Sequence, residues 1–423
     1  MTRPPEPAAE TGGSAISLRV TRAARGPGVI LVAAVIAGGV GFVLTFIVAR
    51  AIGAAAAAQF TAFWSGLYLV VGALAGVQQE VARASRELAP GEPASPTLVR
   101  FAVLAAAASA LLAAAVAAFW VWPVFADRGA GFLLPLAVGP AGYVLTAIVC
   151  GALYGLRRWT SIAAMVIGDA VLRLVVVLIV LGITRDVLAI AWAVALPFFG
   201  TLAILWWFIR SGLRGRVRSD VPLGRLTANA AQAVAGSLAL AILVSGFSLV
   251  TVATSGDVSP ARLGAFVFAV TVVRAPIMVG VMSAQSLLVI TFRDHPAPVR
   301  RALVIAGAVL LAGLIAAVVA ALIGDPILAA VVGPDFRVGA PTLFVIVVSS
   351  ALMGALFVTG PLALSRSRHT IYAVGTIAAA VTSVAALLIP VDFSTRTTLA
   401  LLVAPAVGLL FHAVGIALIP RRA

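Results

Sequence analysis

Apolar stretches of about 20 residues recur along the chain and determine which folds are open to it. A helix of roughly this length crosses the hydrocarbon core of a bilayer. Six such stretches precede a basic segment and six follow it, at residues 29–49, 57–78, 99–121, 132–154, 161–183, 188–209, 227–252, 263–290, 302–323, 341–364, 370–390 and 397–419. A soluble fold cannot bury a sequence that is 62% hydrophobic and only 10% charged. We therefore predict an all-α polytopic membrane protein with about twelve transmembrane helices.

The basic segment between the two halves predicts a two-lobed architecture. Residues 210–226 contain five arginines, one acid and three glycines, so we expect a flexible cytoplasmic linker at the membrane surface. The first apolar stretch is too long for the apolar region of a signal peptide, and we interpret it as an uncleaved anchor. The expected organisation is a disordered cytoplasmic tail at 1–28, an N lobe of six helices at 29–209, the linker at 210–226, a C lobe of six helices at 227–419 and a cytoplasmic C-terminus at 420–423.

The arginines are distributed unevenly across the predicted membrane. With the N-terminus inside, 21 of the 29 arginines fall in inner segments and six in outer segments, while Arg173 and Arg274 fall within spans. An excess of basic residues on the cytoplasmic side is the usual pattern in multi-pass membrane proteins. The sequence thus predicts twelve spans, with both termini cytoplasmic.

Composition and motifs exclude several classes of function. The formal charge is +15, but the basic residues punctuate apolar spans instead of gathering on one soluble face, so no nucleic acid is expected as a partner. The chain has no lysine and therefore no Walker A motif. Its single cysteine, Cys150, lies in an apolar span, which excludes cysteine-ligated metal sites. We expect no enzymatic activity, no metal and no cofactor.

The two halves resemble each other in sequence, which indicates an internal duplication. AQFTAFWSGLYLVVG from Ala58 resembles ARLGAFVFAVTVVRA from Ala261, and YGLRRWT from Tyr154 resembles LSRSRHT from Leu364. The matching segments occur in the same order and at nearly constant separation. Six spans in each half give both halves the same orientation, so a parallel repeat is predicted.

The chain also resembles a known family. LTFIVARAIGAAAAAQFTAFWSGLYLVVGALAG (44–76) is similar to the first helical hairpin of bacterial oligosaccharide flippases, and AAVVGPDFRVGAPTLFVIV (329–347) is similar to an outer segment of that family. The helix start AQFT at 58–61 departs from the family's usual Gly-Tyr-Gly-like start. The family belongs to the multidrug/oligosaccharidyl-lipid/polysaccharide exporter superfamily. The resemblance implies two six-helix lobes, alternating access and outward translocation of polyprenyl-diphosphate-linked sugars.

Three charged residues within the spans are the main candidates for function. Asp169 and Arg173 are four residues apart on one helix face and can pair, whereas Arg274 has no acidic residue in its own span. An ionisable group near the bilayer centre is costly unless it is paired or hydrated. Two interpretations stay open: structural ion pairing, or a hydrated cavity in which Arg173 and Arg274 bind a diphosphate and Asp169 binds a coupling proton or cation.

Two stripes of small and polar residues extend this candidate site. Thr61, Ser65, Tyr68, Gly72, Gly76 and Gln79 share one face of the second predicted helix, and Gly264, Thr271, Arg274, Met278 and Gln285 share one face of the eighth. We take Thr61, Ser65, Tyr68, Thr271 and Gln285 as candidate cavity residues. The alternative is close helix packing through small residues. His412 is interpreted as a hydrogen-bonded core histidine.

The function that these observations predict is transport of a lipid-linked glycan. We expect the protein to flip a polyprenyl-diphosphate-linked oligosaccharide or related glycolipid from the inner to the outer leaflet. Its expected partners are this substrate, the membrane lipids, and a glycan polymerase or glycosyltransferases. The alternatives are a cation-coupled multidrug exporter of the same superfamily, a polytopic glycan polymerase or ligase, and a scaffold of cell-wall assembly.

Overall fold

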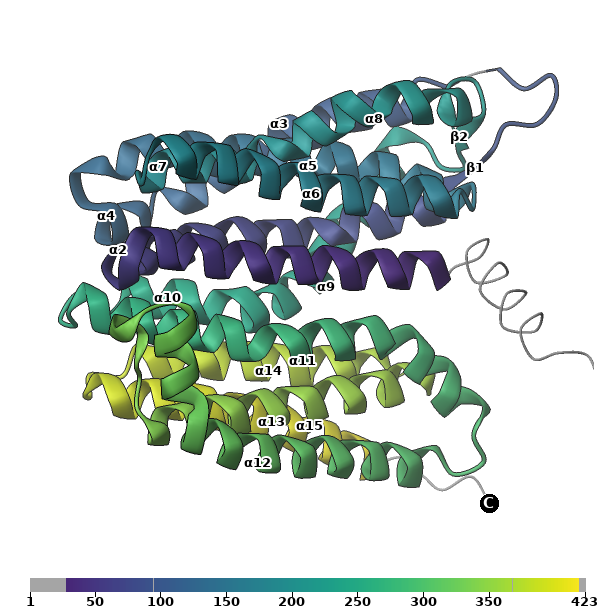
Figure 1. Ribbon diagram of the computed structural model, residues 1–423. Coiled ribbons are helices and arrows are strands. Elements are labelled where there is room, and N and C mark those ends of the chain that lie inside the picture. Colours follow the sequence, from purple (N-terminus) through teal and green to yellow (C-terminus); the bar gives the residue numbers. More distant parts are fainter. Residues whose placement is uncertain (1–27, 94, 367, 418–423) are drawn as a thin grey trace, which may run out of the picture.

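The computed structural model describes residues 28–93, 95–366 and 368–417. The predicted tail up to residue 27 and the predicted C-terminal segment 420–423 lie outside the described residues. The chain forms a bundle of long helices that run roughly side by side (Figure 1). Two short strands, β1 (Ser85–Glu87) and β2 (Val217–Ser219), are the only strands in the described part of the chain.

The first half of the bundle contains α2 (Gly28–Ala84), α3 (Thr97–Ala117), α4 (Val121–Phe125), η1 (Ala126–Arg128), α5 (Gly129–Gly155), α6 (Trp159–Ile183), α7 (Val187–Ala195) and α8 (Pro197–Leu213). The second half contains α9 (Leu223–Ala241), η2 (Ile242–Gly246), α10 (Phe247–Ala253), α11 (Pro260–Asp294), α12 (Pro298–Val331), η3 (Pro334–Phe336), α13 (Ala340–Ser365), α14 (His369–Leu387) and α15 (Phe393–Ala417). In Figure 1 the two halves lie one above the other, and α2 of the first half packs against α9 of the second at the boundary.

The helices confirm the predicted fold class. Within the described residues, ten helical segments are long and apolar enough to cross a membrane. One of them, α2, holds the first two predicted spans, and the eighth predicted span coincides with α11. The protein is therefore an all-α polytopic membrane protein with two six-helix lobes.

A glycine turn separates the first two spans. A straight helix of 57 residues would be far longer than a bilayer is thick, but the backbone of α2 breaks at Gly53, where φ is +78°. Glycine adopts this conformation readily because it has no Cβ. The small-residue segment between the first two predicted spans is therefore a turn between two membrane helices.

The linker between the lobes is folded, contrary to the expected flexible connector. β2 lies in this linker and pairs antiparallel with β1, which directly follows α2, with Arg86 opposite Arg218. The amide of Leu88 donates to the carbonyl of Arg216 at 2.9 Å, and the amide of Asp220 donates to the carbonyl of Ala84 at 2.8 Å. These backbone hydrogen bonds fix the conformation of residues 216–220, although the glycine content of the linker suggested a flexible segment.

Charged side chains hold this strand pair together. Arg86 donates to Asp220 at 2.5 Å and to both carboxylate oxygens of Glu92 at 2.7 Å, and Arg218 donates to the carbonyl of Pro93 at 3.1 Å. The hydrogen bond from Arg86, and then that from the Ala89 amide, lowers the pKa of Glu92 to about 2. We call β1, β2 and the side chains of Arg86, Glu92, Arg218 and Asp220 the latch. The end of the bundle that carries the latch is called the basic end.

Residues 326–340 connect the ninth predicted span to the tenth. Residues up to Val331 continue α12 through Pro326, and the short turn η3 follows. Asp325 accepts hydrogen bonds at 2.9 Å from the amides of Val338 and Gly339. This carboxylate fastens the chain at the start of α13.

The two lobes meet where glycines let helices approach closely. A Cβ added at Gly76 of α2 would overlap the backbone of Ala233 in α9, and one added at Gly264 of α11 would overlap the carbonyl of Ala54 in α2. Near the basic end, Asn229 of α9 donates to Glu80 of α2 at 2.9 Å. The glycines of the two stripes thus serve helix packing, which was the alternative interpretation of these positions.

Gly76→Ala is expected to destabilise the protein, because the methyl group cannot fit between α2 and the backbone of α9. Overpacking of this kind typically costs about 1–3 kcal/mol. Thermal unfolding of the purified protein in detergent measures the effect. Gly39→Ala is the control in the first membrane helix of α2, because a Cβ at Gly39 would meet nothing within 4 Å. Equal melting temperatures for the two variants would contradict the packing.

Acid is expected to open the latch. The folded pKa of Glu92 is about 2, compared with its ordinary value of 4.5, so the stabilisation is complete above pH 4.5 and is lost as the pH falls through 2. Hydrogen exchange at the amides of Leu88 and Asp220, corrected for intrinsic rates, should report this loss of protection. Glu92→Gln should weaken protection already at neutral pH, whereas Glu87→Gln should leave it unchanged. Full protection in Glu92→Gln would argue against the role of this carboxylate.

Candidate functional site

Asp169, Arg173 and Tyr68 lie together in the interior of the N lobe. Arg173 of α6 is 6% exposed and donates to both carboxylate oxygens of Asp169, at 2.7 and 2.9 Å. It also donates to the hydroxyl of Tyr68 in α2 at 2.5 Å. The spacing of four residues places the two charges on one helix face, as predicted.

The end of the neighbouring helix α7 provides a further acceptor for Arg173. Pro197 has no amide hydrogen and starts α8 directly after a break at the end of α7. The carbonyl of Val194, in the last turn of α7, accepts a hydrogen bond from Arg173 Nε at 3.1 Å. The guanidinium also lies 4.3 Å from the centre of the Phe198 ring. Arg173 thus makes four hydrogen bonds and a cation–π contact inside one lobe.

Arg274 lies in the C lobe in a very different environment. Its side chain is 6% exposed, and its guanidinium lies 4.8 Å from the centre of the Phe247 ring. Nε of Arg274 has no hydrogen-bond partner among the described residues. No acidic residue occurs in the sequence between Asp257 and Asp294. Arg274 is therefore a buried cation whose own stretch of chain supplies no carboxylate.

A π-helical turn places Phe247 beside Arg274. The helix from α9 to α10 is interrupted by η2, a π-helix of five residues that ends at Gly246. Such turns are rare and often occur at functional sites, because they shift the register of the side chains that follow. Sequence reasoning missed Phe247, since the segment reads like any apolar helix.

The remaining candidate residues are placed as follows. Thr61 and Ser65 are buried in α2, at 4% and 5% exposure, and Thr271 donates to the carbonyl of Val267 in its own helix at 2.8 Å. The side chain of Gln285 lies outside the described residues. The structure therefore groups Tyr68 with Asp169 and Arg173 and places Arg274 in the other lobe.

Two further buried cationic or titratable groups lie in the C lobe. His412 is fully buried and shares a 2.8 Å hydrogen bond between Nδ1 and the hydroxyl of Thr359, as expected for a core histidine. Arg396, assigned from the sequence to an outer segment, is 8% exposed and donates to Ser255 and Asp257. Its partners come from a distant loop, so no local pattern could indicate this burial.

No cluster of metal ligands occurs in the described residues. Groups of three or more His, Cys, Asp or Glu side chains are not found there. The chemistry that this arrangement offers is thus the binding of charge by buried groups: an ion pair in the N lobe and a cation in the C lobe.

Comparison with known proteins gives relatives over nearly the whole chain. No family model matches the sequence. An uncharacterized protein of Mycobacterium tuberculosis is 30% identical over 383 residues, which cover 89% of this chain and 88% of the relative. An uncharacterized protein of Mycobacterium bovis is 29% identical over 385 residues, with the same coverage.

Solved structures share the fold at low identity. The lipid II flippase MurJ in an inward closed conformation has a TM-score of 0.64 at 9% identity, covering 92% of this chain and 87% of that chain. An inward-facing multidrug resistance MATE transporter of the MOP superfamily has a TM-score of 0.59 at 12% identity, with 92% and 94% covered. A MOP superfamily transporter from Pyrococcus furiosus, described as having a binding pocket of reverse polarity, has a TM-score of 0.50 at 14% identity, with 92% and 95% covered.

The match to the mycobacterial relatives extends through both lobes, and the structural matches cover the same length of chain. The protein belongs to the family of these mycobacterial proteins and has the fold of the MOP exporter superfamily.

Proposed function

We propose that the protein flips a polyprenyl-diphosphate-linked oligosaccharide or related glycolipid from the inner to the outer leaflet of the bacterial plasma membrane. The lobes 29–209 and 227–419 move relative to each other, and the linker 210–226 joins them on the cytoplasmic side. Alternating access by movement of two repeats is common in transporters built this way. The substrate would serve the synthesis of cell-envelope polysaccharide.

The buried cation Arg274 is the observation that carries this proposal. It lies 14 residues after the start of α11, which corresponds to about 21 Å along the axis of this 35-residue helix, and so well away from both helix ends. Removing a guanidinium from water without a counter-charge is unfavourable. A diphosphate would neutralise it, and the planar guanidinium can donate two parallel hydrogen bonds to phosphate oxygens.

Arg173 is less available to a substrate than Arg274. All three of its side-chain nitrogens already donate, to Asp169, Tyr68 and Val194. To hold a diphosphate it would have to exchange some of these acceptors, for example when Asp169 takes up a proton. This makes Asp169, whose side chain is 18% exposed, the candidate coupling site.

The main alternative is a cation-coupled exporter of the same fold. Cationic drugs prefer cavities with free carboxylates, but Asp169 is already paired with Arg173. The solved structures that share this fold include both a lipid II flippase and multidrug transporters, so the fold accommodates both substrate classes. The charge of Arg274 favours an anionic substrate. A glycan polymerase or ligase is the third alternative.

Arg274→Ala is expected to slow leaflet transfer of a fluorescent polyprenyl-diphosphate sugar in proteoliposomes. A hydrogen bond to a charged group contributes about 1.5–3 kcal/mol, which corresponds to roughly a 10- to 100-fold loss. Arg274→Lys should retain part of the rate, since it keeps the charge but not the paired donors. Transfer without new glycosidic bonds distinguishes a flippase from a polymerase or ligase.

Arg128→Ala serves as the control in the same assay. Arg128 is an exposed arginine that pairs with Asp186 at the end of the bundle opposite the latch, and its loss should leave transfer unchanged. Normal transfer by the combined Arg173→Ala and Arg274→Ala variant would eliminate the proposed roles of both residues.

Asp169→Asn is expected to destabilise the N lobe, because it leaves Arg173 buried without its carboxylate. Breaking a buried ion pair on one side costs about 3–5 kcal/mol, whereas replacing both partners by apolar residues can be nearly neutral. The double variant Asp169→Leu with Arg173→Met should therefore recover most of the melting temperature lost in Asp169→Asn. If Asp169 also couples transport to protons, the double variant should be stable yet independent of a pH gradient.

A further inference from the structure

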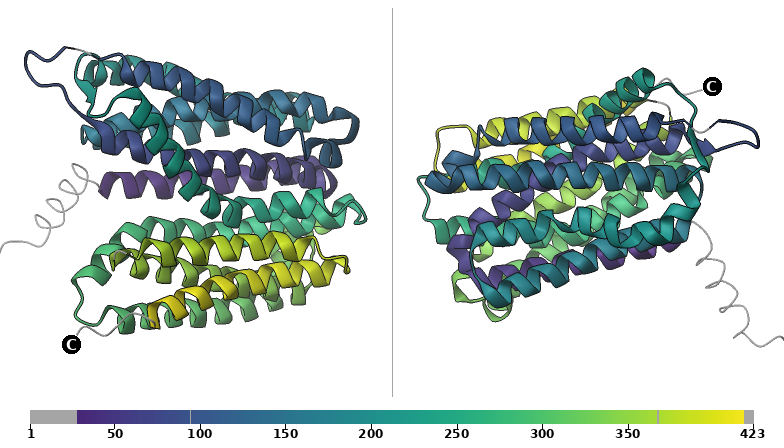
Figure 2. Two further views of the ribbon diagram at one scale, coloured as in Figure 1. Left: turned by 180° about the vertical axis from the view of Figure 1, so that it is seen from behind. Right: turned by 90° about the horizontal axis from the view of Figure 1, so that it is seen from above.

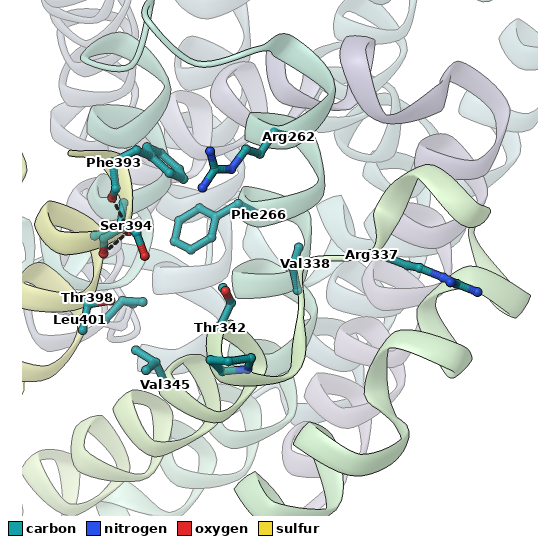
Figure 3. A pocket seen from close by; sticks show the side chains of 12 residues that line it. Arg262, Phe266, Arg337, Val338, Thr342, Val345, Phe393, Ser394, Thr398 and Leu401 are labelled. Atoms are coloured by element: carbon teal, nitrogen blue, oxygen red, sulfur yellow. Dashed lines mark hydrogen bonds between the residues drawn. The ribbon is translucent and has the colours of Figure 1, made fainter.

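A pocket lies at the end of the C lobe opposite the latch, apart from Arg274. Its volume is about 340 Å³, which is within the range that a small ligand occupies. Figure 3 shows its walls, which come from the first turns of α11, α13 and α15 and from the segment before α13. Its polar lining residues are Arg262, Arg337, Thr342, Ser394, Thr397 and Thr398.

Arg262 is the cation that faces this pocket. Its guanidinium lies over the pocket, 5.6 Å from the centre of the Phe393 ring (Figure 3). It forms no ion pair with a described residue, whereas the arginines of the latch, Arg128 and Arg396 all do. The side chain of Arg337 points away from the pocket in the same view. One guanidinium is therefore held by an aromatic ring and left free to bind an anion.

Hydroxyl groups and helix ends add further donors. The hydroxyls of Thr342, Ser394 and Thr398 line the pocket and make no hydrogen bond to described residues. Three long helices begin around the pocket, and the N-terminal end of each carries a partial positive charge. Helix starts bind phosphate and carboxylate groups for this reason.

Three neighbouring acidic residues are engaged elsewhere. No acidic residue lines the pocket. Asp392 accepts from the amide and hydroxyl of Thr395, at 2.9 and 2.8 Å, Asp257 pairs with Arg396, and Asp325 accepts from the amides before α13. These carboxylates offset part of the local positive charge, but none occupies the position in front of Arg262.

We propose that this C-lobe pocket is a second anion site, which binds a phosphate-class group through Arg262 and the hydroxyls of Thr342 and Ser394. The group could belong to the headgroup of a lipid diphosphate or to free phosphate, because both present the same oxygens to the guanidinium. The aromatic rings of Phe266 and Phe393 form the apolar part of the wall. The site does not depend on the proposed flippase function, since it lies apart from Arg274.

Titration calorimetry on the full chain in nanodiscs of phosphatidylcholine tests this site. Inorganic phosphate and farnesyl diphosphate are titrated separately, at low and high salt. Arg262→Ala should weaken binding roughly tenfold, since one charge-assisted pair is lost, and Thr342→Val should weaken it by a smaller factor. Arg337→Ala is the matched control on the same rim and should change the affinity less than about twofold.

The outcomes separate the sources of the anion and the two sites. Binding of both probes supports a free phosphate site, and binding of farnesyl diphosphate alone supports a lipid headgroup site, provided that Arg262→Ala weakens it. Affinity that persists in Arg274→Ala but falls in Arg262→Ala assigns the signal to the C-lobe pocket, whether or not the protein flips lipids. No binding of either probe, or equal losses in Arg262→Ala and Arg337→Ala, would overturn the proposal.

Discussion

The high cost of placing a charge in an apolar medium governs the interior of this protein. In the N lobe this cost is offset, because a carboxylate, a phenol, a carbonyl and an aromatic ring surround Arg173. In the C lobe, Arg274 has an aromatic ring beside it and no acid in its stretch of chain, and its Nε has no hydrogen-bond partner among the described residues. The two lobes are similar in architecture but differ in electrostatics. This asymmetry is the reason for assigning ion coupling to one lobe and anion binding to the other.

Packing between the lobes follows the rule for helices in lipid, where the hydrophobic effect does not drive association. Small residues allow α2 to approach α9 and α11. The hydrogen bond from Asn229 to Glu80 then fixes how α9 lies against α2. Surfaces of this kind can separate without exposing a large apolar core to water. A transporter that must open and close between its lobes requires such an interface.

Sequence reasoning predicted the spans and the pairing of Asp169 with Arg173 because both depend on local spacing. Hydrophobic length alone locates helices in a bilayer, and a separation of four residues alone places two side chains on one face. It did not predict the strand pair, because three-residue strands of mostly polar residues resemble a loop. The partners of Arg173 in α2 and α7, the π-helical turn before Phe247 and the burial of Arg396 depend on contacts between distant segments. The pocket beside Arg262 is formed by three helix ends that are far apart in sequence.

The latch has a consequence for how far the lobes can move. β2 is fastened to the end of α2 in the N lobe, and only Asp220, Val221 and Pro222 separate it from the first residue of α9. So short a tether, fully extended, reaches at most roughly 14 Å. While the strands stay paired, the basic end of α9 cannot move farther than this from the end of β2, which is held against the end of α2. The strand pair thus limits the separation of these two helix ends, and α9 runs obliquely from the latch towards the second half of the bundle (Figure 2).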